Sequence, residues 1–466
     1  MTIATSLPAL AALVSSLPAV ERRAVIPAGF VATGGVAGIK ASGRPDLALI
    51  ATTPGPDGTR PAAAAAAVFT PNAFAAAPVR LSQAHLAATD PDGNGRFGWA
   101  AGVISTSGCA NAATGTAGDA DQAIVAAILA DAIGTTEELT LLLSTGIIGT
   151  RLPLDVVRSG VAAVAPSLAP TDVGLAAAAE ALRTTDSLVK AATTTITLPD
   201  PDGIAVRSVR VTGIAKGVGM IHPRMATMLS ILLTDATVDP VTLHGLLRPA
   251  AARTWDQLSV DGDTSTNDTV FLLASGVAGT APVAAGTHAA GELGRAIEAV
   301  ARDLARQQAA DGEGATTLIT CQVSGAVDDA DARAVARAVI SSSLVKAAVH
   351  GRDPNWGRIA GAAGNATLAD EAVLGAAGLG ASAARSRAGT AAELDPDRLR
   401  IAIAGQLVFD GPAGGPVAFD RTAARATMDA PELLIRLDLG LGAGQGEAFG
   451  CDLTETYVIE NSEYTT

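Results

Sequence analysis

Cysteine, aromatic residues and charge are all scarce in this sequence, and the shortage of cysteine excludes whole classes of protein. The 466 residues include three cysteines, Cys109, Cys321 and Cys451, which are far apart and form no CxxC pair. An odd number at such spacing argues against a disulfide framework and against a zinc site. A reducing cytoplasm is therefore the expected location.

Basic clusters and long apolar runs are also missing. The formal net charge is −14, and no group of lysines and arginines resembles a nucleic-acid-binding stripe, so we expect no nucleic-acid partner. The longest uncharged stretches, such as residues 61–79, are interrupted by proline and asparagine. The apolar start of the chain carries no positive charge before Arg22. We therefore expect no membrane segment and no secretory signal, and interpret residues 7–20 as a surface helix or an overhang.

The sequence is rich in apolar residues, and strand-like segments alternate with helix-like segments along it. Hydrophobic residues make up 48% of the sequence, which is enough for a buried core, and the length suggests two or three domains. The expected strands are 47–51, 67–70, 102–105, 205–211, 228–233, 270–273, 317–323, 399–403 and 433–437. The expected helices are 119–132, 152–164, 172–183, 241–252, 291–309 and 331–349, and residues 136–143 also look helical.

The clearest helix is 291–309, in which one apolar residue recurs every three or four positions. The helix runs directly into the loop Asp311-Gly312-Glu313-Gly314, after which an alternating strand begins. Glu313 is therefore predicted to lie on a turn between a helix and a strand. Glycine on either side would let a backbone or a ligand approach closely.

Common motifs for metal binding, nucleotide binding and serine–histidine catalysis are incomplete or absent. The loops 90–95 and 261–265 carry oxygen ligands at alternate positions, but the twelfth position of an EF-hand is Ala101 in one and Leu272 in the other. The glycine pair in 216–219 completes neither a Walker motif nor a dinucleotide fingerprint. The five histidines form no metal-binding pair, and no GxSxG elbow is present. We expect no metal, no nucleotide cofactor and no serine–histidine catalysis.

The most informative segment runs from Lys216 to Leu229, where a glycine-rich loop meets an uncharged strand. Pro223 fixes its own φ and favours an extended conformation for His222, so the approach to the strand is stiff. Thr227 is predicted to be the first residue of that strand. A stiff loop can hold a peptide bond under strain, but this pattern alone fits an ordinary loop-to-strand entry better.

Met225-Ala226-Thr227-Met228-Leu229 resembles the cleavage site of the ornithine acetyltransferase (glutamate N-acetyltransferase) family, in which the bond before the threonine is cut by the protein itself. Further motifs similar to those of the family occur in the expected order along the chain. They are Gly29-Phe30, Gly38-Ile39-Lys40, Asp46-Leu47-Ala48, Val68-Phe69-Thr70, Ser107–Ala112, Ser144-Thr145-Gly146, Thr184-Thr185-Asp186, Val260–Asp268, Asp311–Thr316, Asp353–Arg358 and Asn461–Thr466.

The resemblance implies cleavage between Ala226 and Thr227, giving an alpha chain of residues 1–226 and a beta chain of residues 227–466. The Thr227 hydroxyl would then be the nucleophile and its new α-amino group the base, an arrangement that needs no histidine. An α-amine titrates at about 7.7–8.0, so part of it is neutral near physiological pH. Thr145 and Gly146 match the family's oxyanion-stabilising pair.

Substrate recognition is implied at five further positions. Lys216 would face a carboxylate and Glu313 an ammonium group, while Thr184, Asn461 and Thr466 match other substrate contacts of the family. Thr185 could replace Thr184. Taken singly, Lys216 could equally be a surface charge, Glu313 a loop acid and the C-terminal tail a frayed end, just as residues 144–146 could be a polar turn.

The function implied is transfer of the acetyl group of N2-acetyl-L-ornithine to L-glutamate, by a ping-pong mechanism through acetyl-Thr227. No metal or organic cofactor would be needed, and the use of acetyl-CoA as a further donor stays open. The implied fold is mixed α/β, with a four-layer αββα core of the DmpA/ornithine acetyltransferase type and a smaller second α/β domain. The two chains would stay together, and two of each would form a heterotetramer that acts on small amino-acid substrates.

The sequence departs from the family pattern at several positions. Thr317 stands where lysine is usual, Cys109 replaces asparagine, and His222-Pro223-Arg224 replaces Ala-Pro-Asn. Arg183 occupies a commonly apolar position. These changes leave open an acyltransferase or amidohydrolase that acts on another N-acylated amino acid in secondary metabolism. A relative that binds amino acids but never matures is a third hypothesis.

Overall fold

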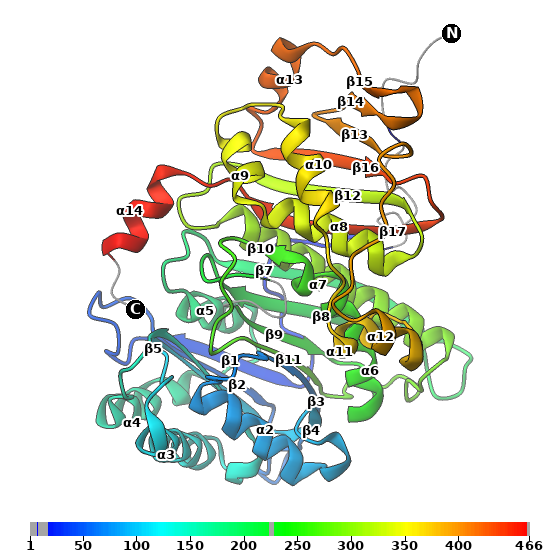
Figure 1. Ribbon diagram of the computed structural model, residues 1–466. Helices are drawn as coiled ribbons and strands as arrows, with labels where there is room; N and C mark the ends of the chain where they lie inside the picture. Colours follow the sequence, from blue (N-terminus) through cyan, green and yellow to red (C-terminus); the bar gives the residue numbers. More distant parts are fainter. Residues whose placement is uncertain (1–6, 8–16, 223–227, 464–466) are drawn as a thin grey trace.

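Two sheets packed face to face form the first part of the fold (Figure 1) in the computed structural model, which describes residues 7, 17–222 and 228–463. The first sheet has the order β1 (Phe30–Gly35), β2 (Leu47–Thr52), β5 (Gly102–Cys109), β6 (Thr140–Ile147). The second has the order β4 (Phe97–Ala100), β3 (Ala63–Phe69), β11 (Thr269–Ala274), β9 (Leu229–Thr234), β8 (Val206–Lys216), β7 (Lys190–Pro199).

The strands of these sheets are apolar on both sides because each sheet is covered on both faces. In β2, Ala48 and Ile50 face the second sheet. Leu47 and Leu49, which alternate with them, face the helices α3 (Gly115–Ile133) and α4 (Leu154–Val164) on the outside. Helix α5 (Asp172–Leu182) packs into the layer between the sheets beside β1, and α2 (Ala77–Thr89) packs against β4 and β6.

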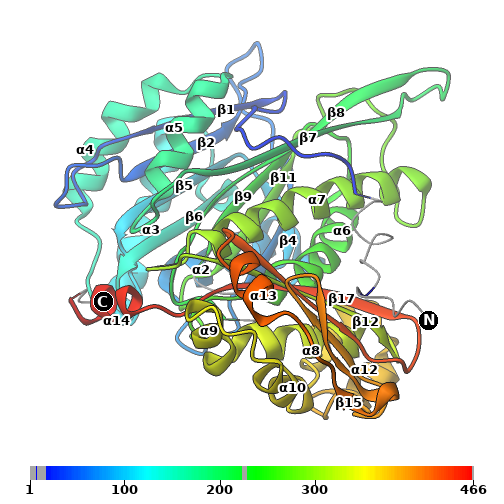
Figure 2. The same ribbon diagram turned by 90° about the horizontal axis from the view of Figure 1, so that it is seen from above.

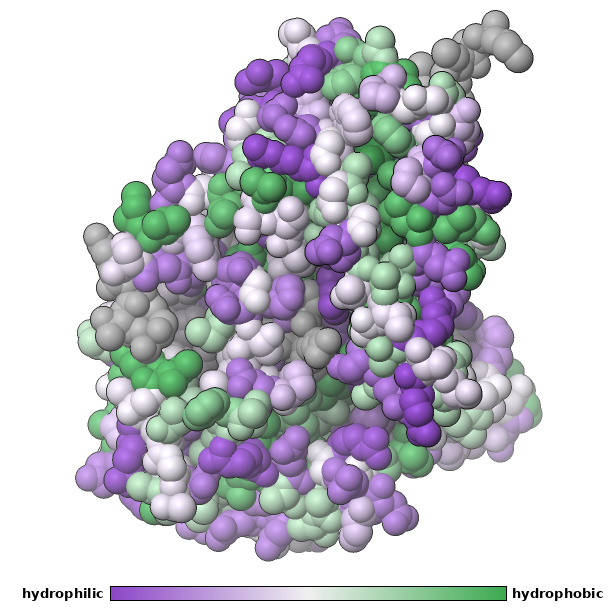
Figure 3. All heavy atoms as spheres, viewed as in Figure 1, coloured by the Kyte–Doolittle hydropathy of each residue, from purple (hydrophilic) through white to green (hydrophobic). Residues whose placement is uncertain are grey.

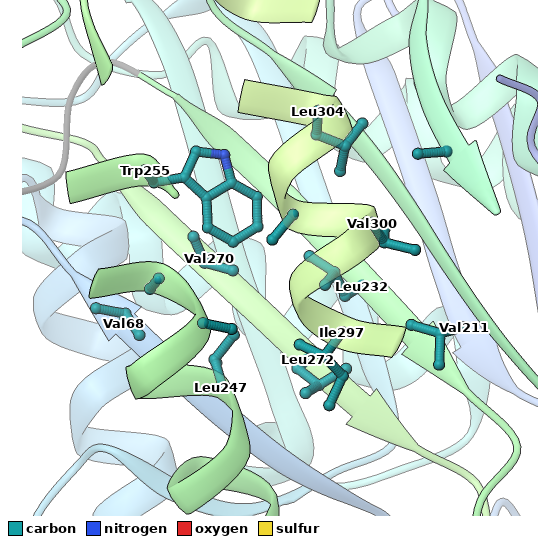
Figure 4. Close-up of a cluster of buried hydrophobic side chains, with 14 of the residues drawn as sticks. Val68, Val211, Leu232, Leu247, Trp255, Val270, Leu272, Ile297, Val300 and Leu304 are labelled. Carbon is teal, nitrogen blue, oxygen red and sulfur yellow. The ribbon is translucent and has the colours of Figure 1, made fainter. Parts of the chain in front are cut away.

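Helices α6 (Pro240–Arg253) and α7 (His288–Ala310) cover the outer face of the second sheet. One cluster of buried side chains joins them to its strands, as Figure 4 shows: Val211, Leu232, Leu247, Val270, Leu272, Ile297, Val300 and Leu304. The apolar positions of the predicted helix 291–309 thus form its buried face. The order of layers is helix, sheet, sheet, helix, and the predicted four-layer αββα core is confirmed.

The second part of the fold is a seven-stranded mixed sheet covered by helices. Its order is β10 (Leu258–Ser259), β17 (Gly444–Cys451), β12 (Leu318–Ala326), β16 (Glu432–Asp438), β13 (Arg400–Ile403), β14 (Gln406–Asp410), β15 (Gly415–Pro416). One face carries α8 (Asp329–Ser341), α9 (Ser343–His350) and α10 (Trp356–Gly364). Helix α7 contacts β12 and β17 as well as β7, so it lies between the two parts (Figure 2). The remaining helices are α11 (Glu371–Ala376), α12 (Ala381–Arg387), α13 (Arg421–Thr427) and α14 (Glu455–Glu463).

Two predictions of secondary structure were wrong. Residues 136–143 were expected to be helical, but residues from Thr140 onward form β6, whose three successive leucines are all buried. A short apolar run without a period cannot distinguish a strand buried on both faces from a helix. The single helix predicted at 331–349 is two helices, because the Ser342 side chain accepts the N–H of Val345 and starts α9.

The surface is mixed in character. On the face shown in Figure 3, hydrophilic residues are spread over both parts of the molecule. In the described part of the chain, no helix has both the length and the apolar character needed to cross a membrane. The N-terminal prediction for residues 7–20 falls largely outside the described residues; Leu7 itself packs against Ala402 and Leu407.

Candidate active site

One cavity lies where β6 and β8 end, and segments distant in sequence meet around it. Its lining includes six residues that the sequence singled out: Thr145, Gly146, Thr184, Lys216, Glu313 and Asn461. Thr185, the alternative to Thr184, lines it too. The other predicted site residues, Ala226, Thr227 and Thr466, lie outside the described residues, as does Arg224.

The end of β6 places Thr145 and Gly146 side by side. The buried Thr145 hydroxyl oxygen accepts a hydrogen bond from Lys216 Nζ at 3.3 Å. Gly146 has φ +128°, and a Cβ there would lie 2.3 Å from the carbonyl carbon of Gly108 on β5. Only glycine fits both the backbone conformation and the space. The strand therefore holds this hydroxyl and this backbone N–H in fixed positions.

Asn267, which also lines the cavity, binds the chain at the ends of β5 and β6. Its side-chain amide donates to the carbonyl of Ala110 at 2.7 Å and to that of Ser144 at 2.8 Å. Both carbonyls flank cavity residues, so Asn267 sets the spacing between β5 and β6 at the site. The sequence placed it inside a family motif but gave it no role, because its partners are more than a hundred residues away.

A buried ion network supports the segment that carries Thr184 and Lys216. Asp186 accepts a hydrogen bond from Lys190 Nζ at 2.7 Å, from the N–H of Gly217 at 2.8 Å and from the N–H of Thr184 at 3.0 Å. Lys190 Nζ also contacts Asp311 at 2.5 Å. Asp186 therefore ties the strand end of Lys216 to the segment after α5.

The charged groups in this network shift one another's pKa values. Burial alone would raise the pKa of Asp186, but Lys216 and Lys190 together hold the pKa of this carboxyl below its ordinary value. Burial lowers the pKa of Lys216, while Asp186 and Glu313 oppose that shift. Lys216 is thus a buried amine whose charge depends on acidic neighbours and on what occupies the cavity.

Glu313 is oriented by donors from two other segments. Its carboxylate accepts the Thr185 hydroxyl at 3.1 Å and the Asn461 side-chain amide at 3.0 Å. Its own N–H donates to the carbonyl of Val218 at 2.8 Å. The turn predicted around Glu313 is confirmed, since α7 ends at Ala310 and β12 begins at Leu318. Helix α14, red in Figure 1, brings Asn461 to this carboxylate.

Three of the residues that depart from the family pattern lie away from the cavity lining. Thr317 is buried; its N–H donates to the Asp452 carboxylate at 2.9 Å, and its carbonyl accepts the N–H of Asp452 at 3.1 Å. The buried Cys109 thiol donates to the carbonyl of Thr150 at 3.2 Å. Arg183 contacts Glu180 at 2.6 Å and the backbone carbonyl of Asp186. Among the described residues that line the cavity, the charged ones are Lys216 and Glu313.

The arrangement is suited to a ligand that carries both signs of charge. A buried amine and an oriented carboxylate line the same cavity, next to a hydroxyl and a glycine N–H. Within the described ranges, no group of three histidine, cysteine, aspartate or glutamate side chains could hold a metal ion.

Known proteins resemble this chain over most of its length. A model described as the ArgJ family matches residues 31–466. An arginine biosynthesis bifunctional protein ArgJ from a Synechococcus species is 44% identical over 441 residues, covering 94% of this chain and 96% of the relative. The protein of the same name from Thermus thermophilus is 39% identical over 441 residues, covering 95% of this chain and 99% of its own.

Solved structures give shorter matches. ArgJ from Bacillus halodurans is 35% identical with a TM-score of 0.42, over 49% of this chain and 96% of that chain. Ornithine acetyltransferase from Mycobacterium tuberculosis, solved in complex with ornithine, is 36% identical with a TM-score of 0.36, over 44% of this chain and 98% of that chain.

The family match includes every described residue that the sequence assigned to the site, and identity of about 40% extends over nearly the full length of the curated relatives. On this evidence the chain belongs to the ArgJ family.

Proposed function

We propose that this chain transfers the acetyl group of N2-acetyl-L-ornithine to L-glutamate. The observation that carries the proposal is the presence of Lys216 and Glu313 in one cavity with Thr145 and Gly146. N-acetylornithine offers a carboxylate and a side-chain ammonium, which match the buried amine and the oriented carboxylate. Thr184 or Thr185, Asn461 and Thr466 complete the proposed binding site.

The proposed reaction has two acyl-transfer steps. The Thr227 hydroxyl attacks the acetyl carbonyl and gives its proton to the α-amine of the same residue. The resulting ammonium passes this proton to the departing nitrogen of ornithine as the carbon–nitrogen bond breaks. Glutamate then takes the acetyl group from Thr227. Because Lys216 donates to the oxygen of Thr145, the Thr145 hydroxyl keeps its own proton to donate to the oxyanion, together with the N–H of Gly146.

The free amine of Thr227 requires cleavage of the Ala226–Thr227 bond, so we propose mature chains of residues 1–226 and 227–466. The second sheet supports their lasting association. Its central strands β11 and β9 follow the cut, whereas β4 and β3 on one side and β8 and β7 on the other precede it. We further propose a heterotetramer of two copies of each chain, which the mass of the native assembly tests.

The proposed chemistry is complete with groups of the chain itself, and we propose that it uses no metal or organic cofactor. A cytoplasmic location fits its free amino-acid substrates and its three unpaired cysteines. Acetyl-CoA as a second acetyl donor is a separate proposal, tested by supplying it with glutamate in the absence of N-acetylornithine.

The test is an acetyl-transfer assay on the purified protein with N-acetylornithine and glutamate, which should yield N-acetylglutamate and ornithine. Thr227→Ala should abolish transfer, and Thr227→Ser should retain part of it. Other N-acylated amino acids as donors, and water as acceptor, test the alternative of an acyltransferase or amidohydrolase in secondary metabolism. A higher kcat/KM for one of those donors would contradict the ornithine assignment.

A further inference from the structure

A second cavity, of about 780 Å³, lies among the helices that cover the seven-stranded sheet. Its lining comes mainly from α8, α10 and the start of α9, and α8 packs against both of the other helices. It shares no described lining residue with the active-site cavity. The motif Asp353–Arg358, which has no part in the proposed acetyl transfer, contributes Asn355, Gly357 and Arg358 to its wall.

The lining of this cavity is positively charged. Arg337 from α8 and Arg358 from α10 line it, together with His222. Its other polar side chains are hydroxyls and amides, and no aspartate or glutamate of the described residues lines it. The whole chain has a net charge of −14, so a cavity with this lining is a local exception that attracts anions.

Arg358 is held in place without a carboxylate. Its Nη1 donates to the carbonyl of Leu344 at 2.8 Å, and within the described ranges it forms no ion pair. The backbone around it is fixed, because Asn355 accepts the Arg358 N–H at 3.2 Å and Trp356 stacks on Phe409 with ring centroids 5.1 Å apart. The guanidinium therefore has a defined position and donors left for a ligand.

A small recess shares Ala334, Arg337 and Thr367 with this cavity and is also lined by Arg333. Arg333 is 6% exposed, and its Nη2 is buried with no hydrogen-bond partner in the part of the chain that the structure describes. Its Nη1 lies 3.9 Å from Asp329. Arg333 and Arg337 are four residues apart on α8, where like charges repel. An anion in the recess would give the unpaired donor a partner and reduce that repulsion.

The N-termini of two helices also meet the cavity. Ser342 caps α9 by accepting the N–H of Val345 at 3.3 Å, and Asn355 caps α10. Both capping residues line the cavity. The first turn of a helix carries partial positive charge on its N–H groups, so both helix ends favour an anion at the same place as the arginines.

We propose that this cavity binds a small molecule with at least two negative charges, carried by phosphate or carboxylate groups. Arg337 and Arg358 bind these groups through charge-assisted hydrogen bonds, which the planar guanidinium can make in pairs to either kind of group. Arg333 binds the part of the ligand that enters the recess. The volume is in the usual range for a small-molecule site. This binding site is independent of the proposed acetyl transfer.

The test is isothermal titration calorimetry of the purified full-length protein with inorganic pyrophosphate and, separately, with succinate. Low ionic strength is needed because salt screens charge interactions. We expect saturable binding of at least one of the two anions. Binding of pyrophosphate alone would identify a phosphate-bearing ligand, and binding of succinate alone a dicarboxylate. Saturable binding of neither anion would overturn the proposal.

Variants locate the binding. Arg358→Gln should weaken it by about tenfold or more, because a charge-assisted contact is lost. Asn365→Asp adds a carboxylate to the lining at constant shape and should also weaken it by about tenfold, with every arginine kept. Arg352→Gln is the matched control, since Arg352 pairs with Asp429 at 2.5 Å and does not line the cavity.

The control should bind the anion within about twofold of the wild type. Equal weakening in Arg352→Gln would show a general effect of charge and overturn the assignment to this cavity. Unchanged binding in Asn365→Asp, or in Arg358→Gln with a wild-type melting temperature, would overturn it as well. If Arg358→Gln fails to fold, Asn365→Asp decides the question.

Discussion

At the scale of single residues, Gly219 decides how close the backbone comes to Glu313. A Cβ on Gly219 would lie 2.3 Å from Glu313 Oε2, and the backbone of Gly219 has no positive φ to add strain. Gly219→Ala should therefore displace the carboxylate from Thr185 and Asn461 without disturbing the fold. We expect the KM for N-acetylornithine to rise by about tenfold, the equivalent of roughly 1.4 kcal/mol, with glutamate much less affected.

Steady-state kinetics on both substrates checks this expectation. Gly245→Ala in α6, where a Cβ meets nothing within 4 Å, is the control for an added methyl group. If Gly219→Ala left the KM for N-acetylornithine unchanged, Glu313 would not be the contact for the ammonium.

The role proposed for the Thr145 hydroxyl is to stabilise the oxyanion of the transition state, not to bind the substrate. Thr145→Ala should lower kcat by about 100-fold or more while KM changes little, because an oxyanion donor acts chiefly on the transition state. Thr145→Ser keeps the hydroxyl and should stay near the wild-type rate. A rise in KM at constant kcat would show instead that the hydroxyl binds the substrate.

At the scale of segments, the Asp186 network holds the site together. Asp186→Asn breaks a buried ion pair, which should cost about 3 kcal/mol near neutral pH. Asp186 has a folded-state pKa below its unfolded value of 3.8, so its contribution is present above that pH and is lost as pH falls through the folded value. Urea unfolding should therefore show a gap between wild type and variant that narrows below about pH 3.8. A gap that widens on acidification would contradict this assignment.

Helix α14 is a separable part of the site. It follows β17, the last strand of the seven-stranded sheet, and Asn461 is its contact with Glu313. Deletion of residues 455–466 should leave self-cleavage and the melting temperature nearly unchanged but raise the KM for N-acetylornithine by about tenfold or more. Asn461→Ala should reproduce part of that rise, and Val458→Ala, at an exposed position of α14, should not. A large fall in melting temperature would show that α14 is structural instead.

A segment could be predicted from the sequence when its structure depends on nearby residues, and not when it depends on partners far along the chain. Helix α7 was predicted from its apolar period, which reports burial on one face. Strand β6 was missed because its leucines are buried on both faces, which depends on partners elsewhere in the chain. Lys190 and Asp311 are 121 residues apart in the sequence, so no local sequence pattern could predict their contact. The six described site residues were identified through family motifs, whose spacing alone did not indicate a shared cavity.

At the scale of the whole molecule, the second sheet interlocks the two proposed chains. Strands β9 and β11 lie between strands that precede the cut, so separation would break hydrogen-bonded ladders on both sides. The two fragments should therefore elute together in native gel filtration and separate only at denaturant concentrations that unfold the protein. Release of either fragment in native buffer would contradict the interlocked arrangement.

The central claim is that one hydroxyl becomes a working nucleophile when the chain is cut in front of it. The most direct measurement combines intact mass spectrometry with N-terminal sequencing of catalytically active protein. The account predicts two chains, residues 1–226 and residues 227–466, with a free threonine amine at the start of the second and full activity in that population. Full activity in protein whose Ala226–Thr227 bond is intact would contradict it.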